Sequence, residues 1–228
     1  MLFITHLAMA QKAIAINSAL CLAAGNGHLE AVRILLDRDA NIHTDNGNAL
    51  RQAAENGHLE VVRLLLDRDT DIHTDNEYAL RQAASNGHLE VARLLLDRGA
   101  DIHANSEYAL CLAAYYNHLE IVQLLLDRGA DIHTDSDCAL RWAVDANHLE
   151  IVRLLLDNGA DIHADNDYPL RWAANHGQLE ITKLLAFSYS TAQLLVIQEE
   201  INSVMLAEVI ACHVPRGART KAALRKIE

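Results

Sequence analysis

The sequence predicts an all-α solenoid in which about six helix–turn–helix units stack side by side. Three observations carry this prediction. The sequence NGHLE, or a close variant of it, recurs every 30 residues between residues 26 and 180. Two further blocks, Asp-Ile-His and Ala-Leu-Arg, recur in step with it. Fixed periods of about 20–50 residues are typical of stacked supersecondary units.

The repeat divides the chain into six units and two ends. The units are 17–46, 47–76, 77–106, 107–136, 137–166 and a truncated 167–187. A unit of this kind cannot bury both of its apolar faces alone, so it must stack on its neighbours. Residues 1–16 lie outside the repeat, and we expect them to form a degenerate N-terminal cap.

The first half of each unit is predicted to be a short helix, as residues 77–106 illustrate. Leu80, Ala83 and Ala84 have i, i+3, i+4 spacing and therefore form a narrow apolar stripe. Gly87 is expected to end this helix in a left-handed conformation.

The residues before the stripe are polar, and we expect them to start the helix. Asp75 or Asn76 is predicted to cap it. Glu77 is predicted to lie in its first turn, where the helix dipole favours an acidic side chain.

A second helix follows in each unit and ends at a glycine such as Gly99. In residues 77–106 its predicted core is Leu89, Val91, Leu94, Leu95 and Leu96. Asp39 and Asp69 stand where the later units have glycine. A left-handed aspartate costs roughly 1 kcal/mol, so we expect these two helix ends to be strained or frayed.

The C-terminal region differs from the array. We predict a capping segment over residues 188–213, with one amphipathic helix over 190–212 that covers the apolar face of the last unit. The alternative is that this helix recruits a second partner. Residues 214–228 are basic and are expected to be mobile.

At this point the units resemble a known family. The residues AASNGHLEVARLLLDRGADI at 83–102 resemble the ankyrin repeat, and the resemblance covers residues 17–187. The family period is about 33 residues, so three residues are missing where the family builds its hairpin finger. We therefore expect truncated hairpins without ladder hydrogen bonds. The 30-residue form is similar to ankyrin arrays of giant DNA viruses of amoebae.

The charge of the chain argues against nucleic acid as its partner, and the length of its apolar runs argues against a membrane helix. The chain has 19 basic and 31 acidic residues, a net charge of −12. Without the five basic residues and one acidic residue that follow residue 213, it has 14 basic and 30 acidic residues. Such a body repels phosphate backbones. No apolar run approaches the ~20 residues that a membrane-spanning helix needs.

The cysteines indicate a cytoplasmic protein, in the host-cell cytoplasm if the source is a virus or an intracellular microbe. Cys21 and Cys111 occupy the same repeat position three units apart, roughly 30 Å, which is too far for a disulfide. Cys138 and Cys212 show no paired spacing, so we expect four reduced thiols. The N-terminus lacks the leading positive charge of a secretory signal.

Ten of the 13 histidines form two columns, and we predict structural roles for both. Members of one column are separated by a whole repeat, roughly 10 Å, so a column cannot form one zinc site. We expect each histidine to pack between units and donate to a backbone carbonyl in its turn. The resemblance also implies that His103 is a conceivable substrate of asparaginyl hydroxylases.

The sequence offers no support for catalysis and no cofactor. It has no nucleophile elbow, phosphate-binding glycine loop or His-Glu-x-x-His motif. The glutamate that ends each NGHLE block is expected to lie at the start of the second helix, where the helix dipole favours an acidic side chain. We therefore predict a non-enzymatic protein. We also expect it to be a monomer.

The candidate binding residues are those at which the copies of the repeat disagree, because scaffold positions keep their residue. Tyr108, Leu112 and Tyr115 share a helix face by i, i+4, i+7 spacing, and Tyr168 begins the same face two units later. In the resembled family these positions face a concave groove. The predicted partner-binding residues are Tyr115, Tyr116, Tyr108, Leu112, Trp142, Asp145, Trp172, Asn175, His176, Ser85 and Glu55.

These residues predict a protein-binding module, since surface aromatics are common interaction anchors. For Trp142 and Trp172, packing between adjacent first helices remains an equal alternative. The second functional hypothesis is an adaptor, in which residues 190–228 recruit a machine such as a ubiquitin ligase to a substrate held by the repeats.

Overall fold

The computed structural model describes residues 2–43, 47–201 and 203–213, which divide into two compact units, Met1–Asp131 and Ile132–Glu228. Every element in the described residues is a helix. The first unit contains α1 (Leu2–Gly25), α2 (Leu29–Leu36), α3 (Asn48–Glu55), α4 (Leu59–Leu66), α5 (Thr74–Ser85), α6 (Leu89–Asp97), α7 (Ala104–Tyr115) and α8 (Leu119–Asp127). The second contains α9 (Thr134–Asp145), α10 (Leu149–Asp157), α11 (Ala164–Asn175), α12 (Leu179–Ala186), α13 (Thr191–Ile201) and α14 (Val204–His213).

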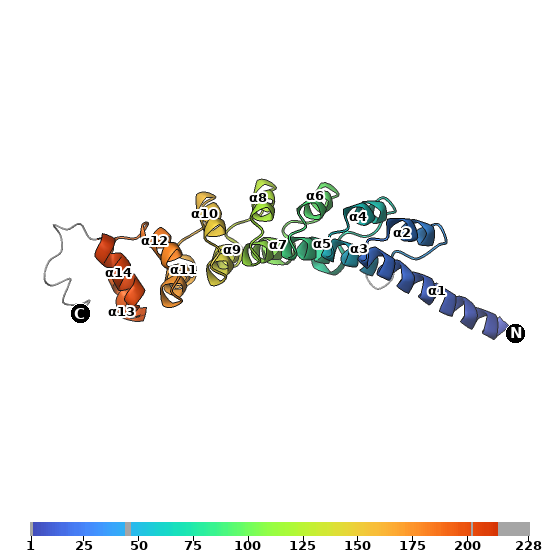
Figure 1. Cartoon of the computed structure of the whole chain (residues 1–228), viewed down its shortest axis with the longest axis horizontal. Coiled ribbons are helices and arrows are strands. Elements are labelled where there is room, and N and C mark those ends of the chain that lie inside the picture. The colour runs from blue at the N-terminus through green and yellow to red at the C-terminus, as the bar shows by residue number, and fades with distance from the viewer. Residues whose placement is uncertain (1, 44–46, 202, 214–228) are drawn as a thin grey trace. The chain divides into compact units, whose positions relative to one another are not determined.

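Within the first unit the helices form two rows (Figure 1). The first helices of successive repeats, α1, α3, α5 and α7, pack on one another, and so do the second helices, α2, α4, α6 and α8. The small side chains of the apolar stripe allow this close packing, and Leu80, Ala83 and Ala84 are at most 1% exposed. The predicted all-α architecture of stacked helix pairs is confirmed.

The repeats are joined by left-handed turns instead of hairpins. Asn105, Ser106 and Glu107, near the start of α7, have φ values of 55°, 56° and 57°, and the same triplet conformation occurs near the start of α5, α9 and α11. Asn and Asp tolerate this region best among residues with a Cβ atom, which explains the Asp, Asn and Ser content of the triplets. The described residues contain no strand, as expected for truncated fingers.

The prediction for Glu77 was wrong. It lies in the left-handed turn, with φ of 57°, and not in the first turn of a right-handed helix. Its side chain is buried and accepts a hydrogen bond from His73 Nδ1 over 2.5 Å. Neighbouring side chains therefore hold Glu77, whereas the helix dipole was the expected reason for an acid at this position.

The expected left-handed aspartates are present at the ends of α2 and α4. Asp39 and Asp69 have φ values of 62° and 60°. Both helices end one residue earlier in their repeats than α6, α8 and α10, where Gly99 and its equivalents adopt the same conformation. The structure therefore has the strained geometry that the substitutions predicted.

The C-terminal segment forms two helices, so the prediction of one helix over 190–212 was wrong. α13 and α14 pack against each other, and both contact α11. Ser203 lies between the two helices: its hydroxyl accepts from Leu206 N at the start of α14 and donates to Ala174 O on α11 over 2.9 Å. Residues 214–228, predicted to be a mobile tail, lie outside the described residues.

The N-terminal region forms one continuous helix. α1 runs from Leu2 to Gly25 and therefore includes both the segment expected as a cap and the first helix of the first repeat. The described side chains from Gln11 to Ala15 are all exposed.

Candidate functional site

One column of histidines positions the ends of the first helices. His88 Nε2 donates to Glu55 O and His118 Nε2 donates to Ser85 O, each over 2.9 Å, and His58 binds Gly25 O in the same way. The carbonyl belongs to the preceding repeat and not to the histidine's own turn, which corrects the prediction. These bonds fix the backbone at the repeat position that Tyr115 also occupies.

The second column of histidines has a different role from the predicted one. His73 and His103 are about 60% exposed, and each donates from Nδ1 to the buried acid four residues later, Glu77 or Glu107. These hydrogen bonds raise the pKa of both imidazoles. The prediction that this column packs between units and donates to carbonyls was therefore wrong.

The tyrosine pair, Tyr115 and Tyr116, is the most exposed aromatic cluster among the predicted residues of the first unit. Tyr115 is 43% and Tyr116 is 50% exposed. Their ring centroids lie 5.0 Å apart in an edge-to-face arrangement with an interplanar angle of 89°. Asn117, with φ of 66°, makes the left-handed turn that follows. Leu112 on α7 is half-buried.

Tyr108, also on α7, is half-buried under an arginine that sequence reasoning left without a role. The Arg81 guanidinium carbon lies 5.8 Å from the Tyr108 ring centroid and 5.5 Å from the Tyr78 centroid. Arg81 also donates to Asn76 O and Asp75 O over 2.9 and 2.8 Å, so it holds the left-handed turn. The recurrence of Ala-Leu-Arg was the signal for this structural role.

Ser85 and Glu55 lie at the ends of α5 and α3, one and two repeats before the tyrosine pair. Both are half-buried. The Glu55 carboxylate accepts from Gln52 Nε2 over 3.2 Å. They add polar groups at the same repeat position.

The second unit contains an aromatic cluster on α11, the Trp172 stack, formed by Tyr168, Trp172 and His176. The Tyr168 and Trp172 ring centroids are 5.6 Å apart, and those of Trp172 and His176 are 3.7 Å apart with nearly parallel planes. His176 Nδ1 donates to Trp172 O over 2.9 Å, which holds the imidazole on the indole. His176 and Asn175 are exposed, and Trp172 is half-buried.

Asp145 joins α9 to the stack. The Tyr168 hydroxyl donates to Asp145 Oδ1 over 3.0 Å. Burial, followed by this hydrogen bond, raises the pKa of Tyr168 to about 12. Burial also raises the pKa of Asp145. Trp142, on the same helix α9, is half-buried.

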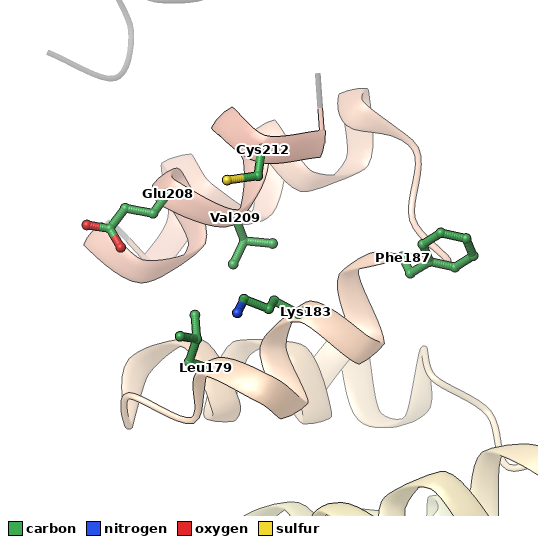
Figure 2. Close-up of a pocket in the computed structure, with 6 residues that line it drawn as sticks. All are labelled: Leu179, Lys183, Phe187, Glu208, Val209 and Cys212. Carbon is green, nitrogen blue, oxygen red and sulfur yellow. The ribbon is translucent and has the colours of Figure 1, made fainter. Parts of the chain in front are cut away.

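A groove between α12 and α14 was not predicted (Figure 2). Its volume is about 490 Å³ and it is lined by Leu179, Lys183, Phe187, Glu208, Val209 and Cys212. Figure 2 shows Lys183 and Val209 directed into the gap and the Phe187 ring directed away from it. Phe187 is 80% exposed and occupies the position of Asp127 and Asp157 in earlier repeats, a departure that could have drawn attention to it.

The described residues were also compared with the requirements of a metal site and of a membrane-spanning helix. They contain no group of three or more His, Cys, Asp or Glu side chains placed to hold a metal ion. All four cysteines are thiols. Over the same part of the chain, no helix combines the length and the apolar character that crossing a membrane requires.

Comparison with known proteins agrees with the architecture. A family model described as "Ankyrin repeats (3 copies)" matches residues 5–76, 68–136 and 110–198. No curated protein sequence matches the chain. Because the matched segments together cover most of the chain and the structure consists of the corresponding stacked helix pairs, the chain belongs to the ankyrin-repeat family.

Proposed function

We propose that this chain is a non-catalytic module that binds one partner protein, with the tyrosine pair as its principal contact. Ankyrin repeats are generally protein–protein interaction modules. The proposal adds the location of the contact on this chain and a cytoplasmic site of action, which the four thiols support.

The exposure of the tyrosine pair is the observation that carries this proposal. Two large aromatic side chains lie adjacent in water beside the half-buried Leu112. Tyrosine is enriched among the residues that contribute most to binding. The equivalent residues one repeat earlier are Ser85 and Asn86, so the repeat fold does not need aromatic rings here.

The other candidate residues supply polar or additional aromatic contacts. Glu55 and Ser85 lie at equivalent positions of earlier repeats and can bind polar groups of a partner. In the second unit, the Trp172 stack presents the exposed His176 beside Asn175. The net charge of −12 disfavours a strongly acidic partner.

The test replaces the tyrosine pair by the residues of the preceding repeat, Tyr115→Ser and Tyr116→Asn. The double variant should keep its helicity and melting temperature but lose the protein that the wild type captures from lysate of its native cells. The matched control is Val196→Ala, which shortens an apolar side chain that is 57% exposed in the other unit and should retain capture. Equal capture by the wild type and the double variant would refute the site.

The groove between α12 and α14 favours a second candidate function, an adaptor that recruits another protein, such as a ubiquitin ligase, through its C-terminal segment. Its support is the exposed Phe187 beside an apolar groove. Phe187→Asp restores the residue of the earlier repeats and should leave the fold intact. An adaptor loses one captured protein in this variant and retains the one that the tyrosine pair binds, whereas a simple cap loses neither.

A further inference from the structure

The first helix pair of the array leaves uncovered an apolar face that later pairs cover. Ile34 on α2 is 50% exposed, whereas its equivalents Leu64 and Leu154 are half-buried and Leu94 and Leu124 are 8% and 7% exposed. Leu22 on α1 is 69% exposed, whereas its equivalent Leu112 is half-buried. No helix of the described residues in the first unit packs on this side of α1 and α2, and we call Ile14, Leu22 and Ile34 the end face.

The composition of α1 strengthens the need for a covering partner. Lys12 is the only charged residue among residues 1–29. Residues 2–10 read LFITHLAMA, and Ile14, one turn further on, is 66% exposed. A long apolar side of a helix is normally buried against another element. Apolar residues at positions 3, 7, 10 and 14 follow the 4-3-4 spacing typical of paired helices.

The last helix pair of the repeats is already covered within its own unit. In the second unit, α13 and α14 already lie against α11 and α12, and their inward residues are buried. These residues are Leu194, Ile197, Leu206, Val209 and Ile210, each at most 4% exposed. A second copy that stacked on α11 and α12 as a further repeat would require the surface that α13 and α14 already cover, so this mode of head-to-tail stacking is closed.

We propose that the end face binds the end face of a second copy of this chain, with α1 packed against α1 in a two-fold symmetric dimer. A two-fold interface needs a patch that is complementary to itself, and an uncharged apolar helix surface meets this condition. A 24-residue helix is about 36 Å long and about 10 Å wide, a footprint of roughly 360 Å², so α1 and Ile34 give an interface at the small end of the range for specific interfaces. The acidic body disfavours anionic lipid as the alternative cover.

The experiment measures the mass of the full chain in solution by sedimentation equilibrium across the micromolar range. The expected result is a species of about twice the 25.2 kDa of the chain. The double variant Ile14→Glu, Ile34→Glu should sediment as a single chain with unchanged helicity, because both residues are exposed within one chain. The matched control Val196→Glu changes an apolar residue that is 57% exposed in the other unit, and it should remain dimeric.

A second, milder variant keeps the test decisive if the double glutamate variant does not fold. Leu22→Gln introduces the residue that two other repeats carry, Gln52 and Gln82, and should weaken the dimer without loss of structure. A single-chain mass for the wild type at every concentration would overturn the proposal, and so would a dimer that survives all end-face substitutions. Wild-type monomers that co-sediment with neutral phosphatidylcholine vesicles would assign the face to lipid and would also overturn it.

Discussion

His103 donates from Nδ1 to Glu107 Oε1 over 2.6 Å, and the same carboxylate oxygen accepts the backbone N–H of Asp131 over 3.2 Å. One buried carboxylate, 3% exposed as a residue, therefore holds both its own left-handed turn and the start of the next link. In the second unit Asp137 accepts the N–H of Asp161 over 2.8 Å in the same way. Because the acid must lie within reach of both donors, an acidic residue at the third position of each triplet serves the fold.

This arrangement predicts a pH dependence of stability. The bond to Glu107, and then its charge, raise the pKa of His103 above 6.5, with Asp101 and Asp131 adding to the effect. The stabilisation that the protonated His103 gives to the fold is therefore fully present below the unfolded pKa of about 6.5. It is lost as the pH rises through the pKa of His103 in the folded protein. The thermal midpoint of the wild type should fall across this range more than that of Glu107→Gln, as differential scanning calorimetry at a series of pH values would show.

The pKa itself can be measured by NMR titration of the imidazole Cε1–H signals. His103 and His73 should titrate above 6.5, and Glu107→Gln should lower the pKa of His103 while leaving that of His73 raised. An unchanged pKa of His103 in this variant would contradict the assigned cause.

The inter-repeat histidine bond predicts a loss of stability in His118→Ala. This variant removes the bond to Ser85 O and leaves a carbonyl without its partner, so the free energy of unfolding should fall by about 1–3 kcal/mol. His118→Gln is the matched comparison, because Gln178 occupies the same position in the last repeat and donates from Nε2 over 2.7 Å to Val144 O, the carbonyl one residue before the equivalent of Ser85. Urea unfolding should show that glutamine restores most of the loss.

The left-handed end of α4 predicts a stabilising substitution. Asp69 has φ of 60°, whereas Gly99, Gly129 and Gly159 occupy the same position in later repeats. Asp69→Gly should therefore raise the free energy of unfolding by up to about 1 kcal/mol. Gly99→Ala should lower it by a similar amount, although no atom lies within 4 Å of the added Cβ, since the backbone at φ of 95° disfavours any side chain. A destabilised Asp69→Gly variant would show that this aspartate has another role.

The Trp172 stack predicts an abnormal tyrosine titration. Tyr168 should ionise near pH 12, because it is partly buried and donates to Asp145. Asp145→Asn removes the charge but keeps the burial, so the pKa of Tyr168 should fall only part of the way to 10. Absorbance of the phenolate against pH in both proteins measures the difference, and an unchanged titration would remove Asp145 as a cause.

The C-terminal helix pair is predicted to stabilise the array as a cap. Leu206 is fully buried, so Leu206→Ala should lower the free energy of unfolding by about 2–5 kcal/mol. Val204 in the same helix is 76% exposed, and Val204→Ala should change it little. Equal effects of the two substitutions in thermal unfolding would contradict the packing of α14.

Most of the fold could be predicted from the sequence because its determinants are local and repeated. The 30-residue period, the i, i+3, i+4 stripe of Leu80, Ala83 and Ala84, and the left-handed Gly87 each reflect a constraint that a single unit imposes. Because the same constraint recurs in each of the six units, every copy supports the same prediction. The family and the all-α architecture followed from this pattern.

The candidate site was only partly accessible from the sequence. Variation between the copies identified Tyr115 and Tyr116, which the structure places together on the surface. The same variation could not separate them from Tyr108, which lies half-buried near Arg81, because exposure depends on the neighbouring repeat. The groove beside Phe187 required the positions of α12 and α14, which no local pattern specifies.

The sequence by itself determined the period, the helix pairs and the left-handed positions, because these depend on residues within one turn or one repeat of each other. Only the tertiary structure decided what Glu77 and Ser203 do. Each binds partners set by the packing of several segments: Glu77 lies buried against His73, and Ser203 starts α14 while binding α11. The free energy of a buried polar group depends on whether its partners are within hydrogen-bonding distance, and that distance exists only once the segments have packed.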